Sequence, residues 1–176
     1  MRGKGNNTAK RLIPKMIVRY PNGGMVIKYN TGDYNSGDIK DLEEIAMIKA
    51  RKERSRIEIL PKVDADNPLY SKLYSDLKST IYERKCPDLR VSSVKGGKRY
   101  VEYESFARPF RPRDLSRMIN RGSKQAASLI IDIRDTNITE NYVRRQVWKN
   151  LSDPDFHRPI KRIWTYDGKE LRSVWK

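Results

Sequence analysis

The chain has 176 residues, with 38 Lys or Arg against 22 Asp or Glu, which gives a formal net charge of +16 at pH 7. This length suits one domain, and a hydrophobic share of 37% suffices for one core, so the composition excludes a disordered polyelectrolyte. The one cysteine, Cys86, and the one histidine, His157, exclude an internal disulfide and a Cys/His zinc site. No stretch approaches the ~20 apolar residues that span a bilayer, so we expect a cytoplasmic protein without membrane contact.

The first part of the chain predicts a β-hairpin followed by a helix. Residues 15–20 and 25–29 are rich in β-branched and aromatic residues and flank Asn22-Gly23-Gly24, which is typical hairpin turn chemistry. After Asp38, apolar residues recur at helical spacing, with acids early and bases late in the segment. We therefore expect a basic tail, hairpin and helix over residues 1–56. A second unit, residues 57–176, would begin at a short strand or extended linker.

The second unit predicts alternating strands and helices. Asn67-Pro68 opens a helix, with Pro at its first position, whose apolar stripe reaches Ile81. Residues 89–94 and 99–106 flank Gly96-Gly97 as a second hairpin, and residues 158–166 and 170–175 form a third. Between them lie a helix over 113–125, a strand over 128–133 and a helix over 139–151 capped by Thr139. We expect the tryptophans in the core or sheet: Trp148, Trp164 and Trp175.

These elements predict an α+β fold. Its sheet should be mainly antiparallel with flanking helices, and the N-terminal hairpin and helix are added to it. On the strand that begins near residue 99, alternation places Tyr100, Glu102 and Glu104 on one face.

The helix over 113–125 carries a basic stripe. Arg113, Arg117, Arg121 and Lys124 recur every three or four residues and therefore share one helical face. Like charges at this spacing cost stability, and a phosphate backbone would relieve that cost with release of counterions. A solvated helix face is the alternative. The predicted nucleic-acid-binding residues are Arg111, Arg113, Arg117, Arg121, Lys124 and Gln125.

The strand before this helix carries a pair of carboxylates. Paired on one face, Glu102 and Glu104 raise each other's pKa, so one could act as general base on a ribose 2′-hydroxyl. Cationic neighbours in the sequence, Lys98, Arg108 and Arg111, could stabilise charge on a phosphoryl oxygen. The alternative is that the carboxylates only form structural ion pairs with the arginines. For His157 we expect an ordinary exposed loop histidine, and a general acid for RNA cleavage is the alternative.

A second chemistry adds Asp88. Together Asp88, Glu102 and Glu104 could hold Mg²⁺, which prefers oxygen ligands. The spacing resembles the Pro-Asp…(Asp/Glu)-x-Lys nuclease motif, with Glu104 where that motif has its lysine. This pattern indicates a Mg²⁺-dependent DNase as an alternative.

A family resemblance supports the first chemistry. Pro87-Asp88, Gly97-Lys98, the segment from Glu102 to Ser105 and Asp167-Gly168-Lys169 resemble motifs of the C-terminal toxin domain of CdiA proteins, which are tRNA-cleaving contact-dependent inhibition toxins. Related domains are grouped with the barnase, EndoU, colicin and RelE nucleases, and occur in phage and mobile-element proteins. The resemblance covers about residues 57–176 and departs from the family in having Glu102 where an aspartate is usual.

The resemblance implies a metal-independent endoribonuclease that acts on tRNA-like RNA, without a cofactor. Its catalytic residues would be Glu102, Glu104, Ser105, Arg108 and Lys98. RNA is then the expected partner, and an immunity protein is a further partner that the resemblance leaves open. The alternatives are a non-catalytic nucleic-acid-binding protein of a phage or mobile element, and the Mg²⁺-dependent DNase that uses Asp88, Glu102 and Glu104.

Overall fold

The computed structural model describes residues 11–30, 33–34, 37–106 and 110–176. In this part of the chain one sheet of eight strands has its strands in the same order as the sequence. The strands are β1 (Pro14–Arg19), β2 (Met25–Tyr29), β3 (Arg56–Ile59), β4 (Leu89–Ser92), β5 (Lys98–Glu104), β6 (Ser128–Asp132), β7 (Arg162–Tyr166) and β8 (Leu171–Trp175). The helices are α1 (Ile39–Glu53), α2 (Pro68–Tyr74), the short 3₁₀ helix η1 (Ser75–Leu77), α3 (Pro112–Gly122) and α4 (Glu140–Leu151). This confirms the predicted α+β class.

Antiparallel pairs predominate in the sheet, as predicted. Antiparallel pairing joins β1 to β2, β3 to β4, β4 to β5 and β7 to β8. The remaining pairs, β2–β3, β5–β6 and β6–β7, are parallel. Each parallel pair is connected through a helix, respectively α1, α3 and α4, because a parallel partner can be reached only by a crossover.

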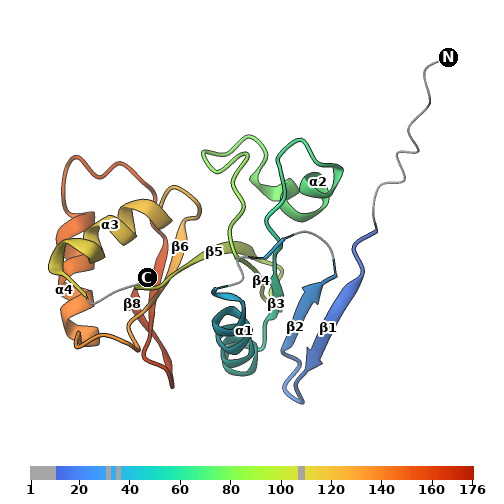
Figure 1. Ribbon diagram of the computed structural model, residues 1–176, viewed down its shortest axis with the longest axis horizontal. Coiled ribbons are helices and arrows are strands. Elements are labelled where there is room, and N and C mark those ends of the chain that lie inside the picture. The colour runs from blue at the N-terminus through green and yellow to red at the C-terminus, as the bar shows by residue number, and fades with distance from the viewer. Residues whose placement is uncertain (1–10, 31–32, 35–36, 107–109) are drawn as a thin grey trace.

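The helices form one layer on each side of the sheet. On one face, α1 packs Leu42 and Ile45 against strand residues such as Val101. On the other face, α3 and α4 bury an apolar cluster with Leu129 and other residues of β6 to β8, and α2 packs beside Tyr100. Figure 1 shows α3 and α4 together at the C-terminal half of the sheet and α1 beside the N-terminal half.

Strand β5 belongs to both halves of the sheet, but with different residues (Figure 1). Its first four residues, 98–101, pair with β4, whereas its last three, 102–104, pair with β6. The first part of β5 is therefore not paired on the β6 side, and the last part is not paired on the β4 side.

The turns and caps have the chemistry that the sequence predicts. Gly23 (φ 89°) and Gly96 (φ 85°) adopt the left-handed conformation in the first two hairpin turns, where a side chain would be strained. At the start of α2, the Asn67 side chain accepts a hydrogen bond from the backbone N–H of Leu69. Thr139 caps α4 in the same manner through Tyr142.

The helix that begins at Pro68 is shorter than predicted. It ends in η1 at Leu77, and Ile81, which the sequence analysis placed on its apolar stripe, is 64% exposed. The chain turns away at Ser79 (φ 61°), and Thr80 stabilises the turn by donating a hydrogen bond to the carbonyl of Leu77. These local hydrogen bonds compete with helix continuation.

One of the three tryptophans departs from the prediction. Trp164 is buried in the sheet, whereas Trp148 on α4 is 64% exposed. The buried stripe of this helix contains Val143 and Val147, and Trp148 lies ~100° around the helix from Val147.

Residues on both sides of the predicted division at residue 57 contribute to one apolar cluster, since it contains Val26 and Ile45 together with Val101 and Trp164. Among the described residues, no helix combines the length and the apolar character needed to cross a bilayer.

Candidate functional site

The antiparallel register of β4 and β5 brings Asp88 to Glu102. Leu89 lies opposite Val101, so the next residues along, Asp88 and Glu102, are cross-strand neighbours on the same face. Glu104 follows on that face two positions further, as the alternation predicted. We name Asp88, Glu102 and Glu104 the carboxylate cluster.

Asp88 is held by the backbone of β5 and by a lysine. It is 7% exposed, and its Oδ2 accepts a hydrogen bond from the backbone N–H of Tyr103 at 2.9 Å. Its Oδ1 lies 2.8 Å from the Nζ of Lys62, which follows β3 and also donates to the carbonyl of Cys86. Sequence reasoning missed Lys62. Its position just beyond a central strand was the available signal, but its contact with Asp88 depends on the pairing of β3 with β4.

Glu102 is the carboxylate of the cluster with an unpartnered oxygen. Its Oε2 is buried and has no hydrogen-bond partner among the described residues. Burial raises the pKa of Glu102 well above its usual value, and the charge of Asp88 raises it further, while Lys62 opposes the shift. A carboxylate in such surroundings is a stronger proton acceptor than an exposed glutamate once it has lost its own proton.

Glu104 is paired with the basic helix. Glu104 is 3% exposed, and its Oε2 accepts two hydrogen bonds from the Arg121 guanidinium, one from Nε at 2.9 Å and one from Nη2. Burial raises the pKa of Glu104, and Arg121 opposes this rise. Gly122 permits the close approach of α3 to β5, because a Cβ atom there would lie 2.8 Å from Leu129 Cδ2 and 3.3 Å from Glu104 Oε1.

A fourth acid and a serine lie at the end of β5. Ser105 donates a hydrogen bond of 3.4 Å to Asp38, the residue that precedes α1. Burial raises the pKa of Asp38, and the charge of Asp88 contributes to the shift, so Asp38 and the carboxylate cluster share one electrostatic environment. From the sequence, Asp38 is expected only to precede a helix, and its proximity to Ser105 was not predicted.

A cavity of about 520 Å³, here the proximal cavity, opens beside this end of β5. Asp38 and Ser105 line one part of it, and the α3 residues Arg117 and Arg121 line another. Two residues of the predicted basic stripe, Arg117 and Arg121, therefore border the same space as the end of the carboxylate-bearing strand.

Most of the other predicted site residues lie on or next to α3. Exposed positions at its start and along it are Arg111, Arg113 and Arg117. In the turn that follows, Lys124 is exposed and Gln125 is partly buried. Lys98 lies at the opposite end of β5 and pairs with Asp76 at 3.3 Å, so the structure does not bring it to Glu102 or Glu104. Arg108 lies outside the described residues.

Two acids of the carboxylate cluster form ion pairs with cations of the protein. Asp88 is paired with Lys62 and Glu104 with Arg121. Within the described ranges, no group of three or more Asp, Glu, His or Cys side chains is arranged to hold a metal ion.

Comparison of the chain with protein-family models, with curated proteins and with solved structures found no match. The resemblance to CdiA toxin domains therefore stays a prediction.

Proposed function

We propose that this protein is an endoribonuclease that cleaves tRNA-like RNA, with Glu102 as the proton acceptor. The observation that carries the proposal is the state of Glu102: it lies beside Asp88, its Oε2 has no partner among the described residues, and its pKa is raised. Transfer of a hydroxyl proton requires a positioned proton acceptor, and a raised pKa makes the ionised carboxylate a stronger one.

The reaction begins when ionised Glu102 takes the proton of a ribose 2′-hydroxyl. The 2′-oxygen then forms a bond to the adjacent phosphorus, the bond from phosphorus to the 5′-oxygen breaks, and that oxygen is protonated by water. The products are a 2′,3′-cyclic phosphate and a 5′-hydroxyl. Negative charge that builds on the phosphoryl oxygens is stabilised by Arg121, whose side chain is 67% exposed although it is paired with Glu104. Lys62 forms an ion pair with Asp88 and so holds this side chain beside Glu102.

The exposed arginines of α3 bind the phosphate backbone of the substrate. Arg113 and Arg117 precede Arg121 on the same helical face, and Arg117 lines the proximal cavity. Each phosphate that such a side chain neutralises releases condensed counterions, so the net charge of +16 favours binding of RNA. Arginine also offers bidentate contact to phosphate.

A Mg²⁺-dependent nuclease is the second candidate. It is favoured by the three carboxylates on one face, because carboxylate oxygens are ligands that Mg²⁺ prefers. The nuclease motif also requires a lysine, and position 104 holds a glutamate instead. Lys62, which forms an ion pair with Asp88, places a lysine beside the acids from another strand end. In the present arrangement Glu104 is turned to Arg121, so the acids do not fit Mg²⁺ as they stand.

One panel of assays distinguishes the candidates. Purified protein is incubated with labelled tRNA and with labelled duplex DNA, each in Mg²⁺ and in EDTA. Cleavage of tRNA that persists in EDTA is the result expected of the proposed endoribonuclease. Cleavage of DNA only in Mg²⁺ would favour the second candidate, and tight binding without cleavage of either substrate would indicate a non-catalytic nucleic-acid-binding protein.

A further inference from the structure

A second cavity, here the distal cavity, lies at the other end of β5 and has a volume of about 330 Å³. It occupies the place where residues 98–101 of β5 have β4 on one side but are not paired with β6 on the other. The segments 126–128 and 159–161 border it instead. Its size falls within the range of small-ligand pockets.

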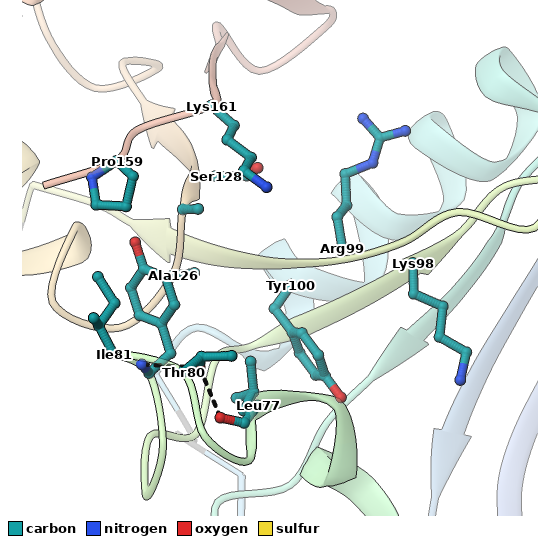
Figure 2. Close-up of a pocket in the computed structure, with 12 residues that line it drawn as sticks. Leu77, Thr80, Ile81, Lys98, Arg99, Tyr100, Ala126, Ser128, Pro159 and Lys161 are labelled. Atoms are coloured by element: carbon teal, nitrogen blue, oxygen red, sulfur yellow. Dashed lines mark hydrogen bonds between the residues drawn. The ribbon is translucent and has the colours of Figure 1, made fainter.

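One part of the distal cavity is apolar and aromatic. Figure 2 shows Tyr100 and Ile81 on the same side of β5, with Ile81 on the turn that follows η1. Ile81 is one of the few large apolar residues with high exposure in the described chain, at 64%. Tyr82 also lines the cavity, and its buried hydroxyl has no hydrogen-bond partner among the described residues. An apolar surface with an unpartnered hydroxyl suits a planar, polar-edged ring such as a nucleobase.

The other part of the distal cavity is cationic. Arg99 and Lys161 line it, and Figure 2 shows both on the opposite side of β5 from Tyr100. Lys98 also lines the cavity but extends from the same side of β5 as Tyr100. The Nη1 of Arg99 is buried without a hydrogen-bond partner among the described residues. Burial lowers the pKa of Arg99, and the positive charge of Arg162 adds to this effect. Leaving a buried guanidinium N–H without an acceptor costs free energy of folding, and a phosphate oxygen is a strong acceptor that would remove this cost.

A short segment of the chain joins residues that line the two cavities. Arg121 lines the proximal cavity, Lys124 is exposed in the turn after α3, and Ala126 and Ala127 line the distal cavity. The backbone N–H of Lys161 donates to the carbonyl of Ala127 at 2.7 Å, which fixes Lys161 at the end of this path. The predicted residues Lys124 and Gln125 therefore lie, along the chain, between a residue of the proximal cavity and the first residues of the distal one.

We propose that the distal cavity is a second nucleotide subsite, which takes one base against Ile81 and Tyr100 and the adjoining phosphate on Arg99 and Lys161. This inference deepens the proposed function and rests on it, because the occupant is a single-stranded portion of the same RNA whose cleavage position lies at Glu102. A strand that passes from Arg121 over Lys124 reaches both sites, so affinity depends on the length of the RNA.

The test measures binding of fluorescein-labelled oligouridylates, a trinucleotide and a dodecamer, to the full chain carrying Glu102→Gln. Lys161→Ala and Ile81→Ser are added as a pair. The matched control is Lys149→Ala, which removes an exposed lysine from α4. We expect the paired change to weaken dodecamer binding about tenfold, since one stacked base and one phosphate are lost, and to leave trinucleotide binding unchanged. The control should change neither.

Equal weakening of both oligonucleotides, no weakening of the dodecamer, or an equal effect of Lys149→Ala would overturn the subsite. Failure of the proposed function is seen separately, as tRNA cleavage by the Glu102→Gln chain at the wild-type rate. The two results are independent. Binding can show no dependence on RNA length although Glu102 is needed for cleavage, and binding can depend on RNA length although Glu102 is not needed for cleavage.

Discussion

The Asp88 side chain takes the place of a strand on the β4 side of Tyr103: its Oδ2 accepts a hydrogen bond from the backbone N–H of Tyr103 at 2.9 Å, just beyond the last residue pair of β4 and β5. Strand β5 thus leaves β4 and continues beside β6 without a buried unsatisfied N–H at this position. The same contact fixes Asp88 next to Glu102, so one side chain serves both the fold and the candidate site.

Replacement of Asp88 should therefore reduce stability as well as cleavage. Asp88→Ala removes an acceptor from the Tyr103 N–H and an ionic partner from Lys62, and we expect a loss of ~2 kcal/mol in the free energy of unfolding. Urea denaturation measures this loss. The control, Asp155→Ala, removes an exposed acid and should stay within about 0.5 kcal/mol of the wild type. An Asp88→Ala protein as stable as the control would refute the role given to Asp88.

Glu102 should make stability fall as the pH rises. Its pKa is raised in the folded state above the usual value of 4.5, so between that value and the raised pKa the folded chain binds more protons than the unfolded chain. Its stabilising contribution is complete below about pH 4.5 and is lost as the pH rises through the folded-state pKa. Glu102→Gln cannot titrate and should flatten this part of the profile of Tm against pH. Parallel profiles for the two proteins would show that Glu102 titrates as an ordinary glutamate.

Gly122 should be intolerant of a side chain. In Gly122→Ala the new Cβ would meet the fully buried Leu129 and press on Glu104, which displaces α3 from β5. We expect a net destabilisation of about 1–2 kcal/mol, because overpacking outweighs the gain of ~1 kcal/mol in helix propensity. Gly37→Ala is the matched control, since a Cβ atom added there would meet no described atom within 4 Å. Thermal unfolding of both variants decides the point, and equal stability would contradict the close packing.

Arg117 should contribute to RNA affinity through charge. Arg117→Glu places a negative charge at the proximal cavity, so tRNA binding should weaken and the slope of log affinity against log salt should decrease in magnitude by at least about 1. Arg145→Glu makes the same charge change at an exposed position on α4. Fluorescence anisotropy over a salt series measures both. An identical loss for the two variants would mean that only net charge matters.

The local features of the fold could be predicted from the sequence because their causes are local. Turn glycines, the Asn67 and Thr139 caps and the alternation along β5 depend on residues within a few positions of one another. The exposure of Ile81 could not be predicted, because the helical segment ends at Leu77 and the chain turns at Ser79 although the apolar spacing continues to Ile81.

The candidate site could be predicted only in part, because alternation gives the face of a strand but not which cations reach it. Lys98 shares its face with Glu104 but lies ~20 Å along the strand, at about 3.3 Å per residue. Conversely, Lys62 is distant from Asp88 in sequence and reaches it through the pairing of β3 with β4. Asp38 likewise reaches Ser105 only through the placement of α1.

The central claim is that Glu102 accepts a proton during RNA cleavage. The most direct measurement is the initial rate of tRNA cleavage in EDTA by the wild-type chain and by Glu102→Gln, purified in parallel with Asp155→Asn as the control for an exposed acid. Glu102→Gln should lose at least about a hundredfold in rate, as expected for removal of a general base, while tRNA affinity stays the same. A Glu102→Gln protein that cleaves tRNA as fast as the wild type and the control would contradict the account.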